Sequence, residues 1–123
     1  MDKKILIIDD EPDFTDLIRM AFDRVGGYEV RALNNPLEAV EAIKEFRPDI
    51  VLLDIMMPDM DGSEVAERIR EDAAISGTRI IFLTGTVARA HIGSPDSMIG
   101  GHVFISKPVN IRELVNCVQK HIG

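Results

Sequence analysis

The chain is predicted to fold as an α/β domain in which helices cover both faces of a doubly wound, five-stranded parallel sheet. Short apolar runs, typical of buried strands, alternate five times with longer segments whose apolar residues recur at helical spacing. This alternation indicates βαβ units with right-handed crossovers. Because the 123 residues contain no linker, repeat or low-complexity tract, we assign residues 1–123 to one domain.

Five strands are predicted from runs of apolar residues. Four of these runs are nearly continuous, which is typical of strands buried on both faces of a sheet. The second run alternates in polarity and therefore predicts a half-exposed strand near a sheet edge. In chain order, the runs are residues 4–8, 28–32, 50–54, 79–83 and 103–105.

The helices are predicted from their start and stop signals. A proline in the first turn, or a capping Asn or Asp followed three residues later by Glu, marks the start of a helix. These start signals are Pro12, Asn35, Asp61 and Asn110. The segment 86–101 should hold the fourth helix, but it contains Gly93-Ser94-Pro95. Since glycine and proline disfavour a helix interior, the fourth helix is predicted to be short or distorted.

Composition narrows the class of protein. The net charge of −7 argues against direct binding of nucleic acid by this domain. No apolar run approaches the roughly 20 residues that span a bilayer, and no signal peptide is recognisable. The single cysteine, Cys117, cannot form an internal disulfide and is expected to pack in the core. We therefore expect a cytoplasmic protein without membrane contact.

Polar side chains follow four of the predicted strands. They are Asp9-Asp10, Asp54, Thr84 and Lys107. In an open parallel sheet the carboxyl ends of the strands form the ligand-binding edge, so these groups are expected to converge. Carboxylates roughly 4 Å apart repel by about 4 kcal/mol per pair at an effective dielectric near 20, and a hard divalent cation removes that penalty. Together with a hydroxyl and an ammonium group, they predict a Mg²⁺-dependent phosphoryl site in which one aspartate is the candidate nucleophile.

The strand-end residues and the motifs around them match a known family along essentially the whole chain. The sequence resembles the receiver domain of two-component response regulators. The resemblance implies a flavodoxin-like fold with five parallel strands in the order 2-1-3-4-5. The matching motifs are Ile7-Ile8-Asp9-Asp10-Glu11-Pro12, Pro48-Asp49-Ile50-Val51-Leu52-Leu53-Asp54-Ile55-Met56-Met57-Pro58-Asp59-Met60-Asp61-Gly62, Leu83-Thr84-Gly85 and Phe104-Ile105-Ser106-Lys107-Pro108.

The resemblance implies a phosphoacceptor and a metal site. Asp54 corresponds to the aspartate that takes a phosphoryl group from a phosphohistidine on a sensor histidine kinase or a phosphotransfer protein. Asp10, Asp54 and the backbone carbonyl of Met56 correspond to direct ligands of Mg²⁺. Asp9 corresponds to an aspartate that acts on the ion mainly through water. The implied cofactor is therefore Mg²⁺.

The resemblance also implies a conformational switch. Thr84 corresponds to the hydroxyl that moves to bond the phosphoryl oxygens, and Lys107 to the ammonium that neutralises a further oxygen. Phe104 stands at the switch aromatic position and lacks the hydroxyl of the commoner tyrosine, so packing alone would drive its rotation. Pro108 matches a cis-proline position, and Gly85 would leave the phosphoryl site open.

The implied function is a phosphorylation-controlled switch rather than a turnover enzyme. The family signals and dimerises through the fourth helix, the fifth strand and the fifth helix, so the Gly93-Ser94-Pro95 segment bears on this output surface. No effector domain is visible in the sequence. Output is therefore expected to pass to a downstream protein target or to an effector domain missing from this chain, with a homodimer possible on phosphorylation.

Two alternatives stay open at this point. An aspartate-nucleophile phosphatase would place a second aspartate two residues after the nucleophile, but Met56 follows Asp54 and Glu11 follows Asp9 at that spacing. Such phosphatases also carry a cap domain or longer insertions. The second alternative is a degenerate receiver that acts as a passive interaction module.

Overall fold

The computed structural model describes residues 2–58, 60–84, 97–99, 102–106 and 109–122. Strands and helices alternate along residues 3–84, as the hydrophobic pattern predicts. The elements are β1 (Lys3–Ile8), α1 (Pro12–Val25), β2 (Tyr28–Leu33), the 3₁₀ turn η1 (Pro36–Glu38), α2 (Ala39–Phe46), β3 (Ile50–Asp54), α3 (Gly62–Glu71), β4 (Ile80–Thr84), β5 (Ser97–Ile99), β6 (His102–Ser106) and α5 (Ile111–Ile122).

The sheet has the strand order β2-β1-β3-β4-β6-β5. Its first five strands are parallel, and they confirm the predicted order 2-1-3-4-5 because β6 is the fifth parallel strand along the chain. The sixth strand, β5, pairs antiparallel with β6 and was not predicted. It lies within the segment 86–101 that was expected to hold the distorted fourth helix, and residues 97–99 of that segment are strand. Residues 93–95 lie outside the described part of the chain.

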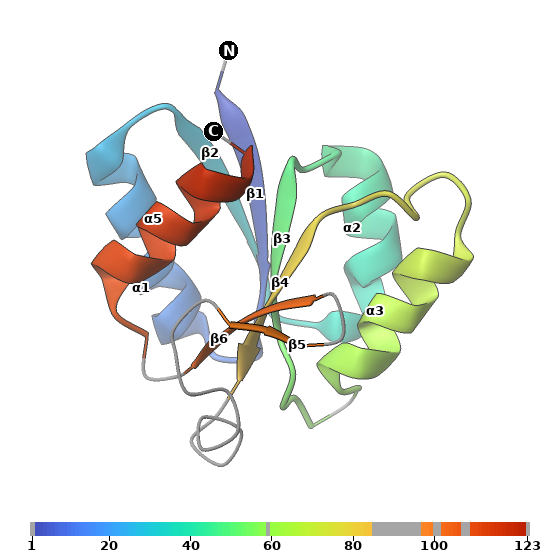
Figure 1. Cartoon of the computed structure of the whole chain (residues 1–123). Coiled ribbons are helices and arrows are strands. Elements are labelled where there is room, and N and C mark those ends of the chain that lie inside the picture. Colours follow the sequence, from blue (N-terminus) through green and yellow to red (C-terminus); the bar gives the residue numbers. More distant parts are fainter. Residues whose placement is uncertain (1, 59, 85–96, 100–101, 107–108, 123) are drawn as a thin grey trace.

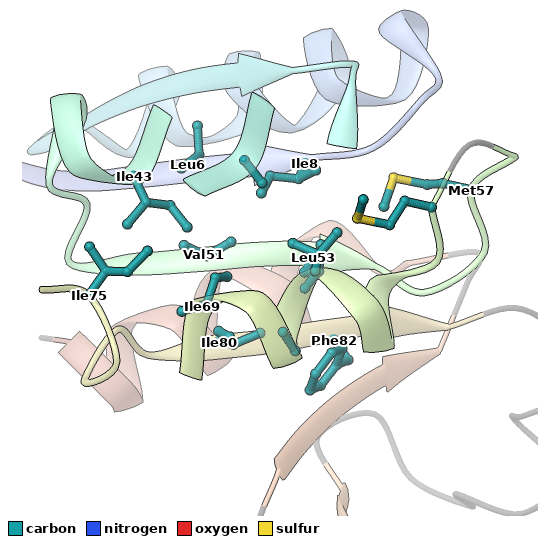
Figure 2. Packing of buried hydrophobic residues seen from close by; sticks show 14 of the residues in the cluster. Leu6, Ile8, Ile43, Val51, Leu53, Met57, Ile69, Ile75, Ile80 and Phe82 are labelled. Atoms are coloured by element: carbon teal, nitrogen blue, oxygen red, sulfur yellow. The ribbon is translucent and has the colours of Figure 1, made fainter. Parts of the chain in front are cut away.

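Helices cover the two faces of the sheet in pairs, α1 with α5 and α2 with α3 (Figure 1). Successive side chains of each central strand point to opposite faces of the sheet, so alternate residues pack on the same face. On the α2–α3 face, Leu6 of β1 and Val51 of β3 pack against Ile43 and Ile69 of these helices (Figure 2). On the other face, Ile5 and its alternate neighbours pack against α1 and α5. All five residues of β3 are therefore buried.

Local signals place the helix ends where the sequence predicts them. Pro12 is the first residue of α1, and Gly26 follows its last residue with a positive φ of 82° that glycine adopts readily. The side chain of Asp61 accepts a hydrogen bond from the Glu64 N–H at 3.0 Å and caps α3. Asn35 likewise accepts from the Leu37 N–H at 3.0 Å, although it caps the 3₁₀ turn that precedes α2. Among the helices that the structure describes, none is both long and apolar enough to cross a bilayer.

Candidate functional site

Three carboxylates meet at the carboxyl edge of the sheet. Asp9, Asp10 and Asp54 each offer an oxygen, and these oxygens all lie within 4.8 Å of one another. Strand register explains the convergence, because Ile8 of β1 pairs with Leu53 of β3 and an aspartate is the next residue after each of them. The three residues that the sequence predicted as acidic metal ligands are thus brought together.

The cluster is largely shielded from water. Asp9 has no exposed surface, and Asp54 is 3% exposed, while Asp10 is partly exposed. Backbone amides fix two of the carboxylates. The Glu11 N–H donates to Oδ1 of Asp9 at 2.9 Å, and the Met56 N–H donates to Oδ1 of Asp54 at 3.2 Å. Grouped carboxylates in a desolvated place repel strongly, so this arrangement favours a bound cation.

The donor chemistry suits Mg²⁺. Every side-chain ligand in the cluster is a carboxylate oxygen, the hard ligand type that Mg²⁺ selects over nitrogen or sulfur. The predicted fourth ligand, the carbonyl of Met56, belongs to the peptide segment directly after Asp54. The partial exposure of Asp10 leaves an open side, as a Mg²⁺ ion that keeps several waters requires.

Thr84 lies beside the carboxylates. It ends β4, the strand next to β3, and Asp54 pairs with Leu83, one position before it. Its side chain is 2% exposed, so its hydroxyl lies inside the sheet edge rather than in solvent. Thr84 pairs in turn with Ser106 of β6, and Lys107 is the next residue along that strand's path. Lys107, Pro108 and Gly85 lie outside the described residues.

Phe104 is half-buried on β6 and contacts the core on the α2–α3 face. Its ring stacks on that of Phe82, the residue that it faces across the β4–β6 pair. Phe104, the predicted switch aromatic, therefore lies opposite Phe82, which is two residues before Thr84 on β4.

Two residues that the sequence did not single out support the site. Asn34 donates its side-chain N–H to the carbonyl of Asp9 at 2.8 Å. Gly62, the first residue of α3, packs so closely on the end of β3 that an added Cβ would lie 2.5 Å from the backbone oxygen of Asp54. The Gly62 N–H also donates to the Ile55 carbonyl at 2.8 Å. In the sequence, this tight turn is indicated only by the position of Gly62 directly after the capping residue Asp61.

Comparison with known proteins assigns the chain to a family. A model of the response regulator receiver domain matches residues 5–119. The transcriptional regulatory protein TrcR of Mycobacterium tuberculosis is 32% identical over 112 residues, which are 91% of this chain and 42% of TrcR. The DNA-binding response regulator MtrA of Mycolicibacterium smegmatis is 31% identical over 99% of this chain and 51% of its own length. The chain thus spans about half the length of these two relatives.

Shorter proteins and solved structures match from end to end. The polar-differentiation response regulator DivK of Brucella anthropi is 29% identical, with 100% of this chain and 98% of DivK covered. A CheY-like response regulator receiver domain from Methanospirillum hungatei superimposes with a TM-score of 0.79 at 27% identity and covers 99% of this chain and 94% of its own. A receiver protein domain from Methanoculleus marisnigri is 33% identical, with a TM-score of 0.70 and coverage of 95% and 94%. The chain therefore belongs to the response regulator receiver domains, the phosphorylation-dependent signalling modules of two-component systems.

Proposed function

We propose that this chain is a Mg²⁺-dependent phosphoacceptor whose phosphorylation at Asp54 changes a partner-binding surface. The observation that carries the proposal is the convergence of the Asp9, Asp10 and Asp54 oxygens within 4.8 Å of one another at the ligand-binding edge of the sheet. The location of Thr84, buried on the adjacent strand end, supports it.

The acidic cluster would hold the ion in a defined way. Asp10, Asp54 and the Met56 carbonyl would bind Mg²⁺ directly, and Asp9 would act through water. When bound, Mg²⁺ supplies charge neutralisation for phosphoryl oxygens. The protein's part is to hold the Asp54 carboxylate in place, which the Met56 N–H does by its bond to Oδ1. The second oxygen of Asp54 would then be the nucleophile.

The proposed reaction is a phosphoryl transfer from a phosphohistidine of a sensor histidine kinase or a phosphotransfer protein. An Asp54 oxygen forms a bond to phosphorus while the phosphorus–nitrogen bond breaks, and its electron pair returns to the imidazole nitrogen. Thr84 would donate its hydroxyl hydrogen to one phosphoryl oxygen, and Lys107 would neutralise another. The phosphoaspartate would later be hydrolysed slowly at the same site, so the chain acts as a switch and not as a turnover enzyme.

Output would follow from the added charge. A phosphoryl group brings roughly two negative charges to the end of β3 and would draw Thr84 and Lys107 toward it. Phe104 would rotate inward as Thr84 leaves its place. The changed surface would bind a downstream protein, an effector domain of the same protein or a second copy of the chain. We place this reaction in the cytoplasm, and we assign the domain no nucleic-acid or membrane contact of its own.

The test is labelling with a small phosphodonor. The chain is incubated with acetyl phosphate and Mg²⁺, and the label is measured by intact-mass spectrometry and located by peptide mapping. We expect one phosphoryl group per chain at Asp54, none after chelation of Mg²⁺ and none in Asp54→Asn. Asp16→Asn, which alters an exposed aspartate of α1, is the matched control and should label normally.

Two outcomes would contradict the proposal. Continuous turnover of a phosphate ester would indicate a phosphatase. Unchanged labelling and partner binding in Asp54→Asn would indicate a passive interaction module.

A further inference from the structure

We propose that Asn34 is a positioning residue for the Mg²⁺ ligand Asp10, an inference that rests on the proposed function of the acidic cluster. Asn34 follows β2 and precedes η1, so it belongs to a loop that contributes no carboxylate to the cluster. Its side chain nevertheless reaches the end of β1, the strand that lies next to β2. It acts on the cluster through the backbone and not by touching the ion.

The contact fixes the peptide group that precedes Asp10. The Nδ2 group of Asn34 donates to the carbonyl oxygen of Asp9 at 2.8 Å. This carbonyl belongs to the planar peptide that joins Asp9 to Asp10, so its direction also sets the direction of the Asp10 N–H and the path of the Asp10 main chain. A hydrogen bond to it therefore restrains where the Asp10 carboxylate can lie.

Backbone groups hold the Asp9 N–H and the Asp9 carboxylate. The Asp9 N–H donates to the Leu33 carbonyl at 3.1 Å, which extends the β1–β2 pairing by one residue. The Asp9 carboxylate accepts from the Glu11 N–H at 2.9 Å. The Glu11 contact closes a local turn around the Asp9–Asp10 peptide, and Asn34 adds a donor from outside that turn to the Asp9 carbonyl itself.

A second contact ties the same side chain to the start of α1. Nδ2 of Asn34 also lies 3.3 Å from Oγ1 of Thr15, and this hydroxyl donates to the Pro12 carbonyl at 3.0 Å. Thr15 is 1% exposed, so its place is fixed by the core. The segment from Asp9 to Pro12, which contains Asp10, is thus clamped at both ends through one amide group.

The orientation of the amide follows from its partners. The Asp9 carbonyl oxygen can only accept a hydrogen bond. The Thr15 hydroxyl already donates its hydrogen to the Pro12 carbonyl, so both partners of Asn34 need a donor. The nitrogen of Asn34 can supply both hydrogens, whereas its oxygen can supply none. An aliphatic side chain at position 34 would leave both acceptors without this donor.

Loss of this clamp should weaken Mg²⁺ binding more than it weakens the fold. Residues behind metal ligands typically contribute about 10- to 100-fold in affinity, because the ligands must otherwise be ordered when the ion binds. Asn34 is exposed and belongs to neither core cluster, so truncating its side chain removes no core packing. For Asn34→Ala we expect the Mg²⁺ dissociation constant to rise about tenfold.

The neighbouring Asn35 offers a matched control. It is also an exposed asparagine with two side-chain hydrogen bonds, from the Leu37 N–H at 3.0 Å and to the Glu38 carboxylate at 3.1 Å. Both bonds join Asn35 to residues of η1, and neither reaches Asp9. Asn35→Ala should therefore lower the stability of the fold by a similar amount and leave the Mg²⁺ dissociation constant unchanged.

The experiment measures two quantities in the wild type and both variants. The Mg²⁺ dissociation constant comes from the amide NMR signals of residues 9–11 during titration, and stability comes from urea unfolding without Mg²⁺. A rise in the constant for Asn34→Ala alone supports the inference. Equal constants in Asn34→Ala and wild type, or equal rises in both variants, overturn it. Failure of the wild type to bind Mg²⁺ would instead overturn the proposed function.

Discussion

The ring of Phe104 on β6 stacks on the ring of Phe82 on β4, with their centroids 5.1 Å apart and their planes inclined by 21°. These two residues face each other across the strand pair, and Thr84 pairs with Ser106 two residues further on. Since side chains two apart share a face of a strand, Phe82 and Thr84 lie in line along β4. Phe104 therefore rests beside Phe82, and an inward rotation would move it along β4 toward Thr84.

Removing the stacking partner should loosen the resting place of Phe104. Phe82→Leu is expected to cost about 1 kcal/mol of stability, from lost ring stacking and packing, and to increase the rotamer exchange of Phe104 in the unphosphorylated protein. The measurement is NMR of selectively labelled phenylalanine rings. Phe22→Leu is the control, because Phe22 packs edge-on against Tyr28 on the other face of the sheet. Unchanged Phe104 signals in Phe82→Leu would contradict this role of the stack.

A methyl group at position 62 should disturb the end of β3. In Gly62→Ala the new Cβ would approach the backbone oxygen of Asp54 at 2.5 Å and Cα of Ile55 at 2.8 Å, so the backbone must shift. We expect a loss of about 1–3 kcal/mol in the free energy of unfolding and weaker Mg²⁺ binding, since Met56 follows in the displaced segment. Urea unfolding and Mg²⁺ titration check both effects.

Gly77→Ala is the matched control for Gly62→Ala. An added Cβ at Gly77 meets nothing within 4 Å, and its φ is not positive. This variant should be neutral or more stable by up to about 1 kcal/mol, because alanine restricts the unfolded chain. Equal stabilities of the two variants would show that α3 can shift away from β3 without cost.

The hydroxyl of Thr84 should matter for the response and not for labelling itself. Thr84→Ala is expected to incorporate phosphate at Asp54 but to lose the amide shift changes that beryllofluoride produces in β6, because no hydroxyl is left to bond the phosphoryl oxygen. Thr84→Ser keeps the hydroxyl and should retain most of these changes. A full response in Thr84→Ala would assign the switch to another group.

The ion pair between Lys44 and Asp72 should make stability depend on pH. Lys44 Nζ lies 2.8 Å from Oδ2 of Asp72. This hydrogen bond, with another from the Ala74 N–H, holds the pKa of Asp72 below its ordinary value of 3.8, and the same pairing raises the pKa of Lys44 above 10.5. Folding thus favours the charged form of both groups.

The sign of the pH effect follows from these directions. The contribution of the pair is fully present above pH 3.8 and below pH 10.5. It is lost as the pH falls through the depressed pKa of Asp72 or rises through the raised pKa of Lys44. Asp72→Asn should therefore be less stable than the wild type near neutral pH, and the difference in urea midpoint should disappear in acid. A difference that stays constant into acid would show that the pair contributes nothing through charge.

The sequence predicted the strands, the helix starts and the residues at the strand ends, because hydrophobic patterns depend on burial and chain direction. The continuous apolar run at 50–54 predicts a strand buried on both faces, and Asp54 then must emerge at the edge where parallel strands end. The same reasoning applied to Asp9 and Thr84 brings the site together. The helix starts at Pro12 and Asp61 were predictable because capping is a local interaction.

The remaining features depend on contacts between distant segments. β5 is a strand because its backbone pairs with β6, and the glycines and the proline around it favour no particular element. The role of Asn34 depends on a loop that lies across the end of β1, 25 residues away in the chain. For Gly62, the sequence shows a turn but not the distance between the start of α3 and the end of β3.

The pairing of β5 with β6 determines where the sheet can meet a strand from another molecule. β6 has a neighbour on each side, so β5 and β2 are the two outermost strands of the sheet that the structure describes. β5 is only three residues long, and β2 alternates half-buried positions with the exposed charges of Glu29 and Arg31. Short and charged edge strands both discourage edge-to-edge pairing. The two edges of the described sheet are therefore poorly suited to pairing with a strand of another molecule, which leaves the helix-covered faces as the larger surfaces for a partner.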